Sequence, residues 1–186
     1  MDRSDRGAWT LPRNRSRERC LSASCRLRTL RWGTVFLLGA AAIAHADEQP
    51  SAAMMQPVRE LVNFMSTLPR GKHASVFASE GVCIVENFAP FLFCGPGAAR
   101  AWEAGFRAHS AEGQLSGLVA RFDEAHDFTK SGTRVYFSLP TTWSGRTHGR
   151  SFEEHGAWAF VLERDQEAWH IVGYGWGVFA YREAEK

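Results

Sequence analysis

The chain has 186 residues, of which 45% are apolar and 23% charged, a composition typical of one globular domain. This balance excludes a disordered tail and a coiled coil. The formal charge of +2 is unevenly distributed: residues 1–46 carry nine Arg and three acids, whereas the other 140 residues carry 13 basic and 17 acidic side chains. Because phosphate neutralisation needs clustered Lys and Arg, this acidic body argues against nucleic acid as a partner.

Residues 1–46 have the organisation of a secretory signal peptide. A positive flank, an apolar run and a small-x-small site follow one another: Arg26, Arg28 and Arg31, then 33–44, then Ala44-His45-Ala46. The apolar run is too short for a stable membrane anchor. We predict export, cleavage after Ala46 and a periplasmic or secreted protein; the alternative is a buried or interfacial helix. Residues 1–25 are Arg-rich and aperiodic, so they are either a disordered extension or the product of an upstream start codon.

The first half of the mature chain is predicted to contain two helices. After a polar leader over 47–53, apolar residues recur at helical spacing over 54–65, with Pro57 expected in the first turn. This helix is expected to end near 68–71. A second helix is predicted over 96–110, because the Gly-Pro-Gly sequence before it marks a break and proline is favoured at a helix start.

A short β-hairpin is predicted between the helices. Apolar runs over 82–85 and 91–94 flank residues 86–90, which fits a hairpin with a loop of about four residues. With that loop Cys83 faces Cys94, and the other two cysteines of the chain lie in the presequence. In an oxidising compartment we expect a disulfide between these two residues; the alternative is a pair of buried free thiols. Two cysteines without a nearby His pair do not make a zinc site, so no metal is predicted.

The rest of the chain reads as an antiparallel meander of long aromatic strands joined by short turns. The expected strands are 115–128, 133–144, 150–162 and 168–179, with turns over 129–132 and 145–149 and a tail over 182–186. Helices followed by a meander predict an α+β domain over 54–181, in which the helices pack on one face of a curved antiparallel sheet.

The order of these elements resembles the nuclear transport factor 2-like superfamily, and within it the SnoaL-like proteins. The resemblance covers about 54–176 and is carried by several short segments: Val82–Glu86, Phe93-Cys-Gly-Pro-Gly97 with Trp102, Arg134–Tyr136, Glu154–Leu162 and Trp169–Ile171. It implies a cone-shaped sheet wrapped around the N-terminal helices, an apolar pocket at the wide end, and often a dimer. It implies no single reaction, because that fold hosts isomerases, cyclases, dehydratases, hydrolases and non-catalytic binders.

Strand alternation predicts what lines such a pocket. One face of the strand over 150–162 carries Glu154 with Phe152, Trp158, Phe160 and Leu162, so this carboxylate is expected to point inward. We predict a pocket formed by Trp102, Phe106, Trp143, Trp158 and Glu86, of which Glu86 is the weaker candidate because it lies at the hairpin turn. The candidate acid–base residues are Glu154 and His126. The structural alternative is a hydrogen-bonded carboxylate and a core or rim histidine.

The last strand is expected to present a different face. The alternation that begins with Trp169 and Ile171 continues as glycines 173, 175 and 177, which predicts either a bend or free space for a ligand. Tyr174 and Trp176 have the opposite parity, so they are expected on the outer face as a surface for homodimer formation. The isomerases of this superfamily pair an acid with Tyr, and no two of the three Tyr residues can be placed beside an acid here.

Two functions follow from these observations. The first is an exported enzyme that binds a small hydrophobic molecule and acts on it by proton transfer, without a cofactor, as an isomerase, cyclase or dehydratase. The second is a non-catalytic periplasmic binding or dimerisation module. Neither requires nucleic acid or a membrane anchor after cleavage. An unpaired carboxylate in the pocket would favour the enzyme, and a fully bonded Glu154 would favour the binder.

Overall fold

The computed structural model describes residues 48–67, 75–166 and 168–184. The predicted signal peptide with its cleavage site, and the expected helix end near 68–71, lie outside the described residues. The elements in chain order are α1 (Ala52–Ser66), β1 (Cys83–Val85), β2 (Leu92–Cys94), α2 (Ala98–Glu112), β3 (Ser116–Phe122), β4 (His126–Ser131), β5 (Arg134–Thr147), β6 (Arg150–Asp165) and β7 (Ala168–Glu183).

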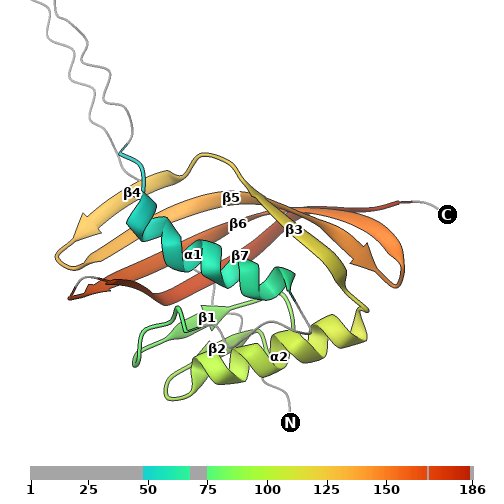
Figure 1. The fold of residues 1–186 in the computed structure, drawn as a ribbon, viewed down its shortest axis with the longest axis horizontal. Helices are drawn as coiled ribbons and strands as arrows, with labels where there is room; N and C mark the ends of the chain where they lie inside the picture. The colour runs from blue at the N-terminus through green and yellow to red at the C-terminus, as the bar shows by residue number, and fades with distance from the viewer. Residues whose placement is uncertain (1–47, 68–74, 167, 185–186) are drawn as a thin grey trace, which may run out of the picture. The chain divides into compact units, whose positions relative to one another are not determined.

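The strands of the described residues form one curved sheet with the order β2-β1-β7-β6-β5-β3, and β4 also pairs with β5 (Figure 1). All neighbouring strands are antiparallel except β1 and β7, which are parallel. The chain before β1 extends this parallel edge, because the N–H of Ile171 bonds to the carbonyl of Val76 at 2.9 Å. The expected α+β architecture is confirmed, with one parallel junction in place of a fully antiparallel sheet.

Both helices lie on the same side of this sheet (Figure 1). α1 contacts β7 and β3, whereas α2 packs against the β1–β2 hairpin. The hydroxyl of Ser51 accepts the N–H of Met54 at 3.3 Å and caps α1, so the helix starts inside the predicted leader. Pro57 therefore lies in the second turn, not the first. Gly97 is the N-cap residue of α2, and its φ of 79° is a left-handed conformation that favours glycine.

The strand predicted over 115–128 is two strands. β3 and β4 are separated by residues 123–125, and each pairs with a different half of β5. At the break, the N–H of Asp123 still bonds to the carbonyl of Pro140 at 3.0 Å. The expectation of one continuous strand was wrong because period-two alternation does not reveal where a strand changes its pairing.

The turns of the meander are shorter than predicted. β4 occupies most of the turn expected over 129–132, and β5 extends into the turn expected over 145–149, whereas β6 begins at Arg150 as predicted. β7 continues to Glu183, so the predicted tail over 182–186 begins inside a strand. Each added residue pair supplies ladder hydrogen bonds, which favours long strands over long loops.

Tyr174 and Trp176 are buried, with 3% and 7% exposure, and the prediction that they form an outer patch was wrong. A register shift between β6 and β7 explains the error. Leu162 pairs with Ile171 but Val161 pairs with Gly173, so Val172 is an extra residue. A bulge of this kind reverses the side-chain alternation beyond it. Tyr174 and Trp176 therefore face the helices, and the dimer surface assigned to them does not exist.

The glycines of β7 do not enlarge a ligand cavity, although free space was one of their two predicted roles. None of glycines 173, 175 and 177 lines the cavity described below. A Cβ on Gly173 would lie 2.5 Å from the carbonyl oxygen of Cys83. Glycine there allows the backbones of β1 and β7 to approach closely in the parallel pairing.

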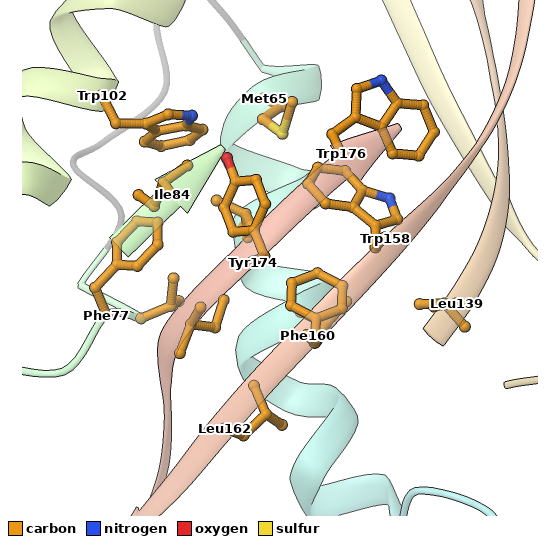
Figure 2. Packing of buried hydrophobic residues seen from close by; sticks show 14 of the residues in the cluster. Met65, Phe77, Ile84, Trp102, Leu139, Trp158, Phe160, Leu162, Tyr174 and Trp176 are labelled. Carbon is orange, nitrogen blue, oxygen red and sulfur yellow. The ribbon is translucent and has the colours of Figure 1, made fainter. Parts of the chain in front are cut away.

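The core lies between the helices and the inner face of β5, β6 and β7 (Figure 2). Trp102 of α2 has no exposed surface and packs edge-on against Tyr174, with ring centroids 6.2 Å apart. Trp158 lies between Tyr174 and Trp176, with its ring centroid 4.8 Å from each. These aromatic side chains connect the helices to the centre of the sheet.

The predicted disulfide between Cys83 and Cys94 is present. The two residues are paired across the β1–β2 hairpin with a Cα–Cα distance of 4.1 Å. Both are exposed on the face opposite Ile84 and Phe93, which point into the core. The disulfide therefore joins the two strands of the hairpin from outside the core.

Candidate functional site

A cavity of about 230 Å³ opens between the end of α2 and the inner face of β5, β6 and β7. Its wall is largely aromatic and includes Phe88, Phe106, Trp143, Phe152, Trp158, Trp176 and Tyr181. Three ionisable groups other than Tyr181 share this wall: Glu86, His109 and Glu154. A concave, mainly apolar space with a few convergent polar groups is the usual form of a small-molecule site.

Glu86 lies directly after β1 and is 5% exposed. Its side chain faces inward because Ile84, Glu86 and Phe88 alternate on the buried side of the chain, and its N–H extends the hairpin ladder to the carbonyl of Phe91 at 3.0 Å. The indole Nε1–H of Trp102 donates to Glu86 Oε1 at 3.0 Å, and the hydroxyl of Tyr174 donates to the same oxygen. In Figure 2, the hydroxyl oxygen of Tyr174 and the indole nitrogen of Trp102 lie on the same side of the core.

Burial raises the pKa of Glu86 from 4.5 to about 7. Loss of solvation is the largest cause, and it outweighs the bonds from Tyr174, Trp102 and the backbone of Asn87, which favour the charged form; the charge of Glu154 raises the pKa further. Both side-chain donors bind Oε1, and Oε2 takes neither of them. The carboxyl group is thus oriented, and near neutral pH it is present in both protonation states.

Glu154 is the second carboxyl group of the cavity. It lies on β6, is partly buried, and accepts the Nε1–H of Trp176 at 3.1 Å. Gly156 allows this contact, because a Cβ at that position would overlap the Trp176 indole. Burial raises the pKa of Glu154, and the bond from Trp176 opposes that shift. Within the described part of the chain, Trp176 is the one side chain that hydrogen-bonds this carboxyl group.

His109 and Tyr181 complete the polar part of the wall. His109 lies in the last turn of α2 and stacks on Phe88, with ring centroids 5.0 Å apart and an interplanar angle of 13°. Burial lowers the pKa of His109, so the imidazole is neutral at pH 7. Tyr181 pairs with Glu154 across β6 and β7, stacks on Phe152 and is 50% exposed, which places it on an open side of the cavity.

The indole nitrogen of Trp158 stands out among the buried polar atoms. Trp158 is 1% exposed and lines the cavity, and its Nε1–H has no hydrogen-bond partner among the described residues. In Figure 2 this nitrogen lies on the side of the ring away from Tyr174. A buried donor without a partner is uncommon, and it is satisfied when a ligand or water supplies an acceptor.

The structure brings together most of the residues selected from the sequence. Glu86, Glu154, Phe106, Trp143 and Trp158 all line the cavity. Trp102 does not line it and lies behind Glu86, where it acts as a hydrogen-bond donor.

His126 is in a different place from the one expected. It is exposed at the start of β4, outside the cavity wall, and its carbonyl accepts the hydroxyl of Ser138 at 3.4 Å. The prediction assumed one strand through residue 128, and the break at 123–125 removes His126 from the inner face. The expectation that His126 lies on the inner face, in the pocket with Glu154, was therefore wrong.

Sequence reasoning ranked Glu86 too low and did not select His109, Tyr174 or Trp176 for the site. The alternation of Val82, Ile84, Glu86 and Phe88 was a usable signal, because it places the carboxylate on a buried face. No comparable signal existed for Tyr174 and Trp176, whose direction depends on the bulge at Val172.

Neither a metal centre nor a membrane-spanning helix is found in the described ranges. No group of three or more His, Cys, Asp or Glu side chains in these ranges is arranged to hold a metal ion. No helix within them is long and apolar enough to cross a lipid bilayer.

No protein-family model matches the chain, and no curated protein matches it. Among solved structures it is similar to hexachlorocyclohexane dehydrochlorinase LinA type 3 of Novosphingobium barchaimii (10% identity, TM-score 0.58, covering 72% of this chain and 88% of that one). A scytalone dehydratase-like protein of Novosphingobium aromaticivorans has 9% identity, TM-score 0.58 and coverage of 72% and 87%. Aln2 of a Streptomyces species has 17% identity, TM-score 0.55 and coverage of 70% and 94%. At these identities the similarity is one of fold.

Proposed function

Since the chain has the nuclear transport factor 2-like fold of the SnoaL type, we propose that its cavity binds a small hydrophobic molecule and catalyses proton transfer on it. The reaction class is that of an isomerase, cyclase or dehydratase, driven by side-chain acid–base chemistry. Two of the similar structures carry names that denote elimination reactions, a dehydrochlorinase and a dehydratase-like protein. Their names support the class and leave the substrate open.

The observation that carries this proposal is the raised pKa of the buried Glu86 in the cavity wall. General acid–base catalysis is most effective when the pKa of the catalytic group is close to the working pH, and burial brings the pKa of Glu86 to about 7. In its protonated form, Oε1 accepts the two bonds from Trp102 and Tyr174 while Oε2 carries the proton. In this proposal Glu86 exchanges that proton with the ligand, and Trp102 and Tyr174 are positioning residues.

A proton transfer also needs a partner group in the same cavity. His109 is neutral and therefore able to accept a proton. Glu154 offers a second carboxyl group from β6. In this proposal one of the two removes a proton from the ligand while Glu86 protonates the departing or rearranging atom.

We further propose that the protein is exported, with Asp47 as its first residue. The support comes from the Arg-flanked apolar run of the sequence, and from a disulfide that persists in oxidising compartments. The dimer expected from the resemblance has no assigned surface once Tyr174 and Trp176 are placed in the core.

The alternative is a binding module without catalysis. The bond from Trp176 to Glu154 favours it, because a hydrogen-bonded carboxylate can be purely structural. Both functions need a ligand in the cavity, but only the first moves protons to and from it.

Hydrogen–deuterium exchange into ligands separates the two. The purified protein is incubated in D₂O with a panel of hydrophobic ketones, and loss of the α-proton signals is followed by NMR. We expect catalysed exchange that Glu86→Gln slows by about 10²–10⁴-fold, since this is the usual contribution of one acid–base group. Glu153→Gln, on the neighbouring residue of the opposite sheet face, serves as the control. Saturable binding without exchange would establish the binding module, and exchange that survives Glu86→Gln would remove Glu86 from the reaction.

A further inference from the structure

One buried hydrogen-bond donor in the cavity wall has no role in the proposed proton transfer. Trp158 is 1% exposed and lines the cavity, and its Nε1–H has no hydrogen-bond partner among the described residues. A buried tryptophan usually has its N–H hydrogen-bonded, because an unpaired donor loses its hydration without replacement. A phenylalanine would fill the core here without that cost. Packing alone therefore does not explain a donor at this position.

The side chains packed around the Trp158 ring offer its N–H no acceptor. On β6, Trp158 pairs with Leu139 of β5 and Trp176 of β7. Its ring stacks on Phe160 with centroids 5.3 Å apart. Leucine and phenylalanine have no polar side-chain atom, and an indole is a donor only. In Figure 2 the Trp158 nitrogen lies on the side of its ring away from Tyr174, so the acceptor has to come from the cavity that Trp158 lines.

The two carboxyl groups of the wall do not accept this hydrogen bond either. Glu86 takes its two side-chain donors on Oε1, and neither of them is Trp158. Glu154 and Trp158 are separated on the inner face of β6 by Gly156, and the indole of Trp176 occupies the space where a Cβ of Gly156 would lie. That same indole donates to Glu154. The cavity wall is thus complete only when something in the cavity accepts the hydrogen bond from Trp158.

The charges of the wall restrict which acceptor fits. An ammonium ion has no lone pair to accept an N–H, so a cation leaves the donor unpaired. A carboxylate has lone pairs, but it would share the cavity with Glu86 and Glu154, and no Lys or Arg of the described residues lines it. An uncharged oxygen on an otherwise apolar molecule meets both conditions, because the rest of the wall is largely aromatic.

We propose that Trp158 selects and orients the ligand: its Nε1–H donates to an uncharged oxygen, a carbonyl or a hydroxyl, of a small hydrophobic molecule. This inference rests on the proposed function in that it uses the same cavity, and it adds the polar group that the ligand carries. Glu86 bonds to the hydroxyl end of Tyr174, whereas the Trp158 nitrogen lies on the side of its ring away from Tyr174 (Figure 2). The ligand therefore meets Trp158 and Glu86 with different atoms.

Four probes of similar shape test the inference on the purified protein: the ketone acetophenone, the alcohol 1-phenylethanol, the hydrocarbon α-methylstyrene and the anion benzoate. NMR titration of the ¹⁵N-labelled tryptophan N–H signals measures binding. We expect an oxygen probe to bind about tenfold more tightly than α-methylstyrene and to move the Trp158 proton downfield, as a new hydrogen bond requires, and we expect benzoate not to bind. A preference for acetophenone assigns a carbonyl ligand, and a preference for 1-phenylethanol assigns a hydroxyl ligand.

A matched pair of variants connects the preference to one N–H. Benzothienylalanine, a tryptophan analogue with sulfur in place of the N–H, is incorporated in place of Trp158 and, as the control, in place of Trp143, which lines the same cavity. The analogue keeps the shape of the ring, and thermal unfolding checks that each variant is folded. We expect the change at Trp158 to remove the preference for oxygen probes while α-methylstyrene binds as before, and the change at Trp143 to retain the preference.

The outcomes separate this inference from the proposed function. Equal binding of α-methylstyrene and the oxygen probes overturns the role of Trp158 and leaves the proposed hydrophobic site intact. A preference that survives the loss of the Trp158 N–H, or that disappears with the change at Trp143, also overturns it. Failure of every uncharged probe to bind overturns both the inference and the proposed site.

Discussion

Glu86 and Glu154 are the same residue type in one cavity, but their surroundings differ. Glu86 is 5% exposed, lies within the disulfide-linked hairpin directly after β1, and accepts hydrogen bonds from Trp102 and Tyr174 on one oxygen. Glu154 lies on the long strand β6, is partly exposed to solvent and receives Trp176 alone among the described side chains. Both carboxyl groups have a raised pKa, and that of Glu86 reaches about 7.

The difference shows that burial and hydrogen bonding have separate effects on a carboxyl group. Hydrogen bonds to a carboxylate favour its charged form, yet the group with more donors has the larger increase in pKa, because desolvation outweighs its three donors. Donors orient Glu86, and burial determines its protonation. Glu154 keeps contact with solvent, and its pKa responds less to the protein.

The largest expected effect is a pH dependence of the free energy of unfolding, which distinguishes Glu86 from Glu154. Because the folded-state pKa of Glu86 is raised from 4.5 to about 7, its contribution to stability is fully present below pH 4.5 and is lost as the pH rises through 7. The loss amounts to about 3 kcal/mol. Urea unfolding of the wild type and of Glu86→Gln between about pH 4 and 8 measures it, since the variant lacks this component. Parallel stability profiles for the two proteins would contradict the assignment, and Glu154→Gln should retain most of the wild-type slope.

The next effect concerns the hairpin that carries Glu86. Replacing Cys83 and Cys94 by Ser opens a short loop, which is expected to reduce the free energy of unfolding by about 2 to 3 kcal/mol. Glu86 lies three residues after Cys83, so the NMR signal of its carboxyl carbon should broaden or change its chemical shift in the same variant. The signal of the Glu154 carboxyl carbon should do neither. NMR of ¹³C-labelled glutamate measures both. Equal changes at the two carboxyl groups would indicate a general loosening of the fold.

The smallest effect is expected at Glu154. Glu154→Gln should change the free energy of unfolding by less than about 1 kcal/mol at pH 7, because the amide oxygen still accepts the Trp176 N–H and the side chain is partly solvated. Chemical denaturation measures the change. A loss as large as that from opening the disulfide would show that Glu154 belongs to a buried network, as the structural reading of this residue requires.

The sequence predicted the inner face of β6 correctly over its whole length. Glu154, Trp158, Phe160 and Leu162 all point inward, because the extra residues at both register shifts lie in β7, so the period-two alternation of β6 itself is uninterrupted. The hairpin and its disulfide were also predictable, because loop length determines which residues face each other in a hairpin. The same rule failed for β7, where the extra residue Val172 reverses the faces.

By itself, the sequence determined the order of helices and strands, the α+β class and the pairing of Cys83 with Cys94, because these depend on periodicity and short-range geometry. Only the tertiary structure decided that Glu86 is buried, that Tyr174 bonds to it from a residue 88 positions away, and that His126 is outside the cavity. The pKa of a carboxyl group and the direction of a side chain beyond a bulge depend on what packs around them. That information resides in contacts between distant segments, which no local pattern contains.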